Sequence, residues 1–154
     1  MSRGEELDPH LLDEMLATCG CLNLRMVTRT VTQLFDEALR PSGVRATQLP
    51  ILATLALQGP TTITKLSSGL ALDRTSVTRL LKPLQRRALI RIVEGPDHRT
   101  RLASLTFQGE RTVTHAYALW TAAQQRFLDE FGRERWQHTR TTLAGVASAM
   151  RLSG

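Results

Sequence analysis

The sequence has few aromatic residues, only two cysteines and no long hydrophobic run. The cysteines, Cys19 and Cys21, are too few and too close together to cross-link a secreted fold. The longest uninterrupted apolar run is only a few residues, which excludes a membrane-spanning helix. The acidic start also lacks the basic and then apolar pattern of a secretory signal. These absences predict a cytoplasmic protein with no membrane partner.

What the chain does contain is 42% apolar and 22% charged residues, with a net charge of +6 over 154 residues. This is enough for one domain with a buried core. The positive charge is concentrated in residues 45–111, which carry 11 Arg or Lys against 4 Asp or Glu, a balance of +7. Residues 1–44 carry 4 Arg against 7 acids, and residues 112–154 carry 5 Arg against 3 acids. A central block of this kind is typical of a module that binds a polyanion.

Apolar residues at three- and four-residue steps predict long helices in both flanking blocks. The first block predicts one helix from Asp8 to Leu39, bent near Gly20. The last block predicts a helix from Gly109 to a break near Gly132, and a final helix after it. Both apolar stripes are broader than one small module can cover, which indicates an interface with a second copy. A bundle within one chain is the alternative.

The central block predicts a helix-turn-helix followed by a hairpin. Thr47 is expected to cap a helix whose Pro50 lies in the tolerant first turn. Two short helices follow, one starting at Thr61 or Thr62 and one capped by Asp73. Beyond them, residues 89–94 and 101–106 change to the strand period and are joined by a basic loop, which predicts a wing. Pro83 is expected to kink or shorten the second short helix.

A helix of this kind fits the major groove of duplex DNA, and a wing reaches the neighbouring minor groove. The residues expected on the outward side of the second short helix are Arg74, Thr75, Ser76, Thr78, Arg79 and Lys82. Of these, Arg79 is expected to pair bidentately with guanine, whereas Thr75 and Ser76 contact a base, a thymine methyl group or a phosphate. Thr64 and Lys65 in the preceding helix are expected to hold phosphate. The wing candidates are Asp97, His98, Arg99 and Arg101.

Within the wing, Arg99 is the best candidate for a narrow minor groove. Asp97 is expected to shape the loop by pairing with Arg99 or with an arginine of the helix. Six of the seven aromatic residues lie outside residues 45–111, so stacking on single-stranded bases is not expected. Duplex groove reading is therefore the favoured mode.

At this point the sequence resembles the MarR family of winged-helix transcription regulators. Residues 72–81, LDRTSVTRLL, are similar to the recognition helix of that family. The wing signature is matched by Asp97 and Arg99, then by Leu105-Thr106 and by Gly109 at the start of the next helix. The resemblance extends over nearly the whole chain, since its length and helix order agree as well. It departs at Ala88, where the family commonly has Gly, and at Pro83.

The resemblance implies a mostly α fold with a small β-wing, divided into three parts. Residues 1–44 and 112–154 would form dimerisation helices, and residues 45–111 would form the winged helix-turn-helix module that binds DNA. The implied function is a homodimeric repressor on a palindromic operator. Two recognition helices one DNA turn apart predict a site of about 15 to 20 base pairs.

Members of the family commonly release DNA when a small aromatic acid enters a cleft, or when a cysteine is oxidised. The candidate cleft residues are Leu22, Met26, Arg29, Leu49 and Leu52, with Arg29 as the partner of a carboxylate. Core packing is the alternative explanation for the apolar ones. Cys19 and Cys21 would lie about 200° apart around one helix, so a bond between them is not expected there. One alternative is that the cysteines form disulfide bonds across a dimer. The other is that they are small buried residues with no redox role.

An enzyme is not expected, because the sequence has no Gly-rich phosphate loop, nucleophile elbow or Ser/His/Asp constellation. The cysteines and histidines also lack zinc-ligand spacing, so no metal or cofactor is predicted. Two other functions remain open at the level of sequence. One is a nonspecific architectural DNA-binding protein, and the other is a helical module whose basic centre binds an acidic protein.

Overall fold

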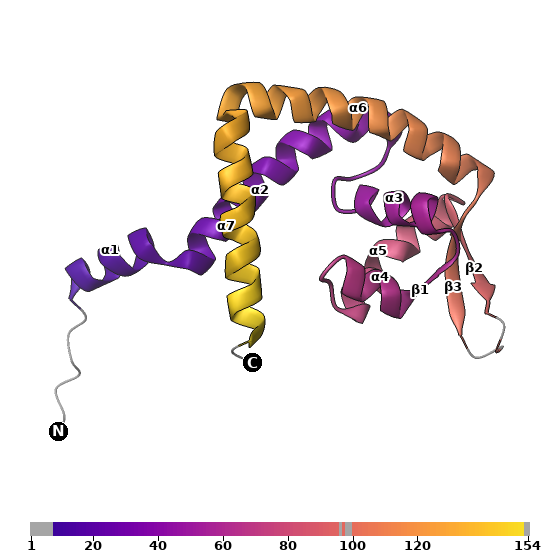
Figure 1. Cartoon of the computed structure of the whole chain (residues 1–154), viewed down its shortest axis with the longest axis horizontal. Coiled ribbons are helices and arrows are strands. Elements are labelled where there is room, and N and C mark those ends of the chain that lie inside the picture. Colours follow the sequence, from indigo (N-terminus) through magenta and orange to yellow (C-terminus); the bar gives the residue numbers. More distant parts are fainter. Residues whose placement is uncertain (1–7, 96, 98–99, 153–154) are drawn as a thin grey trace.

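The computed structural model describes residues 8–95, 97 and 100–152 as a mainly helical chain with one small sheet. Long helices extend away from a compact central module, and one of them, α6, passes along the top of Figure 1 from the module to the start of α7. The elements are α1 (Pro9–Thr18), α2 (Gly20–Leu39), the 3-10 helix η1 (Arg40–Ser42), α3 (Leu49–Gln58), β1 (Thr61–Thr62), α4 (Ile63–Gly69), α5 (Arg74–Arg86), β2 (Ile90–Glu94), β3 (Arg101–Leu105), α6 (Phe107–Phe131) and α7 (Arg133–Leu152).

The first block forms two helices that meet at Cys19, beside the expected bend near Gly20, so the expectation of one helix from Asp8 to Leu39 is wrong. Cys19 has extended backbone angles and ends α1, and its Sγ accepts the amide of Leu22 (3.5 Å) as the cap of α2. The side chain of Asn23 donates to the carbonyl oxygens of Ala17 (3.2 Å) and Cys19 (2.9 Å). These bonds supply partners for carbonyl groups at the break, because the end of a helix leaves such groups without helical partners.

The helix α3 begins at Leu49, and its cap residue is Gln48 rather than the expected Thr47. Gln48 makes no side-chain cap bond. Its Oε1 instead accepts the amide of Arg45 (3.0 Å) and closes the preceding turn. Pro50 lies in the first turn as expected, where its missing N–H has no helical partner to lose.

The two short helices of the central module begin where the sequence predicts. Thr62 caps α4 by accepting the amide of Lys65 (3.1 Å), and Asp73 caps α5. The helix α5 continues through Pro83 to Arg86, so the proline does not end it. Ala88 adopts the left-handed conformation, with φ of +52°. This explains why glycine suits the position, since only glycine has no steric cost there.

The sheet has the strand order β1-β3-β2, and both pairings are antiparallel. The expected wing is confirmed as the β2–β3 hairpin, in which Ile90 pairs with Leu105 and Glu94 pairs with Arg101. The strand β1 was not expected. Its two residues pair with Leu102 and Ala103, so they join the start of α4 to the middle of β3.

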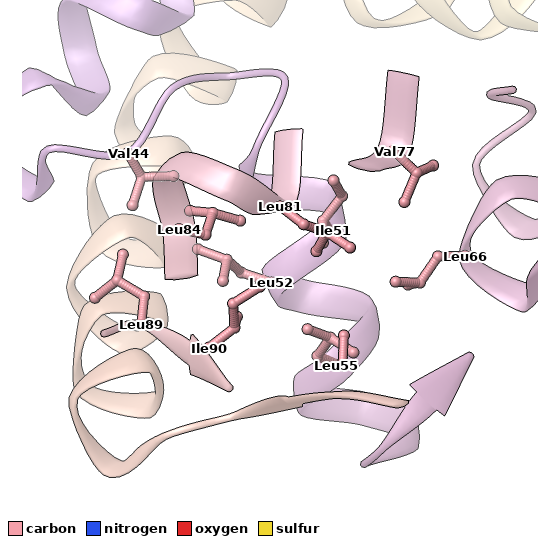
Figure 2. Packing of buried hydrophobic residues seen from close by; sticks show 11 residues of the cluster. Val44, Ile51, Leu52, Leu55, Leu66, Val77, Leu81, Leu84, Leu89 and Ile90 are labelled. Carbon is pink, nitrogen blue, oxygen red and sulfur yellow. The ribbon is translucent and has the colours of Figure 1, made fainter. Parts of the chain in front are cut away.

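The core of the central module is a single apolar cluster from α3, α4, α5 and the sheet (Figure 2). Its buried members are Val44, Ile51, Leu52, Leu55, Leu66, Val77, Leu81, Leu84, Leu89, Ile90 and Ala103. A second, aromatic cluster joins the long helices. The ring of Phe127 in α6 lies 6.4 Å from that of Phe35 in α2 and 5.1 Å from that of Trp136 in α7. The module and the long helices are therefore each held by their own contacts.

Candidate nucleic-acid interface

The helix α5 has one buried and one exposed side, as a period of 3.6 residues requires. Val77, Leu81 and Leu84 are buried in the core. The residues of the exposed side include Arg74, Thr75, Thr78, Arg79 and Lys82, and Ser76 is half-buried at its edge. Three cations and two short polar side chains are thus brought onto one solvent-facing surface.

The start of α5 is organised by Asp73 and Ser76. The carboxylate of Asp73 accepts the amide of Ser76 (2.8 Å) through Oδ1 and the hydroxyl of Ser76 (2.6 Å) through Oδ2. These two hydrogen bonds, the one from the hydroxyl first, lower the pKa of Asp73 below its ordinary value of 3.8. The hydroxyl hydrogen of Ser76 is engaged in this cap, which leaves its oxygen lone pairs to accept bonds from a ligand.

Replacing Asp73 with Ala should lower the melting temperature and weaken DNA binding, because the first turn of α5 loses its cap. The lowered pKa means that the stabilisation is present above the ordinary pKa of 3.8 and is lost as pH falls through the folded-state pKa. Thermal unfolding followed by circular dichroism between pH 7 and acid pH measures this. Asp73→Asn is the matched control, since asparagine also caps helices but does not titrate. Equal acid sensitivity of the wild type and Asp73→Asn would contradict a pH-dependent stabilisation of α5 by the Asp73 carboxylate.

Two further side chains of the exposed side bond within the protein. A guanidinium nitrogen of Arg74 donates to the hydroxyl of Thr64, which links α5 to α4, and the hydroxyl of Thr78 donates to the carbonyl of Arg74 (2.8 Å). Arg79 and Lys82 make no hydrogen bond or ion pair with the described part of the chain. Their charged groups are therefore available to a ligand without breaking any of the described contacts.

The described part of the wing is shaped by Asp97. Its carboxylate accepts both the amide (2.8 Å) and the hydroxyl (2.6 Å) of Thr100, and the amide of Gly95 donates to the carbonyl of Thr100 (2.7 Å). Asp97 thus shapes the loop through Thr100. Arg101 is exposed on β3. His98 and Arg99 lie outside the described residues.

The base of the wing meets the start of α6 at Thr106 and Gly109. The hydroxyl of Thr106 accepts the amide of Gly109 (3.0 Å) and donates to the carbonyl of Ala88 (2.6 Å), while its amide donates to the carbonyl of Leu89 (3.1 Å). A Cβ on Gly109 would overlap the carbonyl oxygen of Leu89. These contacts explain the Thr and the Gly of the wing signature, because Thr106 bonds to both sides of the junction and Gly109 has no room for a Cβ.

The five candidate effector residues do not come together in one cavity. Leu49 lines an apolar cavity of about 490 Å³, but Leu52 is fully buried in the core of the module. Leu22 is half-buried and Met26 exposed, and Arg29 lines a different, more polar cavity beside η1.

The apolar cavity is formed by α2, α3 and α6 and includes residues that the sequence analysis missed. Its lining consists of Val31, Thr32, Phe35, Leu39, Ala46, Leu49, Pro50, Ala53, Val113, Tyr117 and Trp120. The rings of Tyr117 and Trp120 are stacked, with centroids 6.0 Å apart. The clustering of aromatic residues in the last third of the chain is the sequence signal that could have indicated this wall.

Other kinds of site are less well supported by the described residues. No group of three or more His, Cys, Asp or Glu among them could hold a metal ion. None of the helices in the described part of the chain has the length and hydropathy needed to cross a membrane. Cys21 is exposed and Cys19 half-buried, and the break at Cys19 overturns the expectation that both lie in one helix.

The exposed polar side of α5, the short helix α4 before it and the hairpin after it form a winged helix-turn-helix. Residues 44–99, which include α5 and the candidate base-reading residues, match the model of the MarR family. The chain belongs to the MarR family. The expected fold class is confirmed with it, and the protein is a DNA-binding transcription regulator.

The chain is similar to several transcription regulators of known sequence or structure. MosR of Mycobacterium tuberculosis, solved in complex with DNA, is 31% identical, with a TM-score of 0.79 over 88% of this chain and 98% of that one. The helix-turn-helix-type regulator YwoH of Bacillus subtilis is 26% identical over 69% of this chain and 77% of its own length. PcaV of Streptomyces coelicolor, solved with its natural ligand, shares the fold at 20% identity, with a TM-score of 0.78 over 97% of this chain and 99% of that one.

Proposed function

We propose that this MarR-family regulator is a homodimeric repressor that reads a palindromic duplex operator with α5 and the wing. The observation that carries the proposal is the exposed side of α5, where Arg79 and Lys82 have no partner in the described chain beside the short hydroxyls of Thr75 and Thr78. This is the chemistry that reads base edges and phosphates. The relative MosR was solved in complex with DNA, which supports DNA as the partner of this chain.

The homodimer is supported by the apolar side chains that the single chain leaves exposed on its long helices. No residue of α1 is buried, and Met15 in α1 and Met150 in α7 are 54% and 66% exposed. The others on α1, α2 and α7 are Leu11, Leu12, Leu16, Leu24, Met26, Val27, Leu143 and Val146. An apolar surface of this extent needs a partner, and a second copy offers the same surface in a two-fold arrangement.

Selection of bound sites from random duplexes tests the proposal directly. We expect a palindromic consensus of about 15 to 20 base pairs, because two recognition helices related by a two-fold axis read two half-sites about one turn apart. Failure to enrich any site would favour the architectural alternative, in which binding rests on phosphate contacts alone. No binding to any duplex, together with binding to an acidic protein, would favour the helical interaction module.

We propose that a small molecule controls DNA binding from the apolar cavity of α2, α3 and α6. Its volume of about 490 Å³ is in the range of ligand sites. The lining contains Thr32, Tyr117 and Trp120 as polar groups but no Arg, Lys or His. A buried carboxylate without a cation is costly, so the cavity favours an uncharged aromatic effector over the aromatic acid expected from Arg29.

Filling the cavity should abolish effector binding and leave DNA binding intact. We expect Ala53→Phe to remove calorimetrically detected binding of 2-naphthol, an uncharged ring compound of suitable size. In the wild type, 2-naphthoate should bind at least about tenfold more weakly than 2-naphthol, because its charge has no partner. Ala56→Phe is the control, since Ala56 is exposed on the same helix and does not line the cavity. Equal binding of 2-naphthol by the wild type and Ala53→Phe would exclude the cavity.

Thiol oxidation is a second candidate control, favoured by the position of Cys19. Its Sγ caps α2 at the break from α1, and Cys21 is exposed two residues later. Peroxide would oxidise the Cys19 thiol to a sulfenic acid, with release of water, and the added oxygen would change the group that caps α2. The junction of two helices in the proposed dimerisation region would change with it. Operator binding measured with and without peroxide tests this. Binding lost on oxidation in the wild type, but retained in Cys19→Ser and Cys21→Ser, would support the thiol control.

A further inference from the structure

The segment between α2 and α3 is held by hydrogen bonds from both of its neighbours in space. From α2, the carboxylate of Asp36 accepts the amide of Ala46 (2.7 Å). Within the segment, the hydroxyl of Ser42 donates to the carbonyl of Leu39 (2.7 Å) and accepts the amide of Val44 (3.2 Å). These bonds attach residues 42–46 to the end of a long helix.

The same segment is bonded to the end of the recognition helix α5. Arg87, the C-terminal cap residue of α5, donates through one guanidinium nitrogen to the carbonyl of Gly43 and through the other to that of Ser42 (3.5 Å). Arg87 lies 44 residues from Gly43 in the chain, so this contact exists only in the tertiary structure.

Gly43 is suited to this contact in two ways. Its φ of +69° lies in the left-handed region, which glycine adopts without steric cost. A Cβ at this position would lie 2.5 Å from a guanidinium nitrogen of Arg87. A larger residue would therefore displace the guanidinium from the two carbonyl groups.

We infer that Asp36 and Arg87 form a clamp on residues 42–46 that fixes the angle of the recognition helix relative to α2. Both are positioning residues, because they act on the placement of α5. The inference rests on the proposed function, in which α2 belongs to the dimerisation region. In a two-fold dimer, the angle between α2 and α5 sets the distance between the two recognition helices, and so the operator spacing that the protein accepts.

The clamp also adjoins the apolar cavity. Ala46, whose amide is held by Asp36, lines the cavity together with Leu39 at the end of α2. A molecule that displaces Ala46 would strain the bond to Asp36. The cavity and the clamp thus share Ala46.

The test is the affinity for selected operators whose half-sites are moved apart or together by two base pairs. This change rotates one half-site by about 70° and shifts it by about 7 Å. The wild type should discriminate against the altered spacings by about tenfold or more. We expect Arg87→Ala to reduce this discrimination to about threefold or less. The end of α5 then loses its hydrogen bonds to residues 42–43 and keeps only the packing of Leu81 and Leu84 in the core.

Arg86→Ala is the matched control for loss of charge, because Arg86 is the exposed neighbour at the end of the same helix. A uniform loss of affinity at all spacings, equal to that of Arg86→Ala, would overturn the inference and make Arg87 a phosphate contact. An unchanged spacing profile would overturn it as well.

Asp36 gives an independent test that does not depend on the folding of Arg87→Ala. Asp36→Ala should reduce the discrimination between operator spacings. Asp36→Asn should keep the wild-type discrimination, because its amide oxygen still accepts a bond from the amide of Ala46. Equal profiles for the two variants would overturn the role of Asp36. If the wild type itself shows no spacing preference, the proposed dimer on a palindromic operator fails. A wild-type preference that both alanine variants retain refutes the clamp alone.

Discussion

Replacing Arg79 with Ala is expected to weaken binding to the selected operator by about 1 to 3 kcal/mol and to relax base choice at one position of each half-site. Arg79 is exposed on α5, and it has no partner in the described chain that would compete for its guanidinium group. The proposed bidentate pair with guanine would be lost with the side chain, and alanine offers no replacement donor. Repeating the site selection with the variant, alongside titrations of operator and random duplex, measures both effects.

Lys65→Ala is the control for a contact that does not read sequence. Lys65 is exposed on α4, where its ammonium group is expected to meet phosphate. Its loss should weaken binding to all duplexes alike and reduce the slope of log affinity against log salt by about 1. If Arg79→Ala also lowered the affinity for operator and random DNA by the same factor, the architectural alternative would be favoured over sequence-specific reading.

Replacing Gly109 with Ala is expected to destabilise the fold by about 3 kcal/mol, the upper end of the usual cost of overpacking. The added Cβ would overlap the carbonyl oxygen of Leu89, and the side chain of Leu105 lies 3.0 Å away on another side. The overlapping atom belongs to the backbone of Leu89 at the base of the wing, and it cannot rotate away as a side chain could. The hairpin must therefore move away from α6. We therefore expect DNA affinity to fall together with stability.

Urea unfolding followed by circular dichroism measures the stability of Gly109→Ala. Gly69→Ala is the matched control, since Gly69 ends α4 with no atom within 4 Å of its added Cβ. The control should be neutral or slightly stabilising, because alanine favours helix more than glycine does. A Gly109→Ala variant as stable as the control would show that the contact with Leu89 is not tight in solution.

The elements of the central module were predictable because their signals are local. Asp73 and Thr62 cap the helices that follow them, and the change from helical to strand period marks the hairpin. The exposed side of α5 follows from the same periodicity, which places Arg79 opposite Val77 and Leu81. Each of these features depends on residues within a few positions of one another.

The errors occurred where a local pattern allowed more than one outcome. Thr47 and Gln48 both precede a helix, and Gln48 took the cap position because its side chain closes the turn with Arg45. The apolar period runs through Cys19 without interruption, but the backbone breaks there, with Asn23 bonded to the carbonyls on both sides of the break. The strand β1 has only two residues, and it exists because β3 lies beside it.

The family, the exposed polar side of α5 and the basic character of the module were contained in the order of residues along the chain. The cavity and the clamp were not. Phe35, Ala53 and Trp120 line one cavity only because α2, α3 and α6 pack together. Likewise, Arg87 reaches the carbonyl of Gly43 across 44 residues of sequence. Spacing along a chain determines which side chains share one helix face, whereas contacts between distant segments depend on how those helices pack.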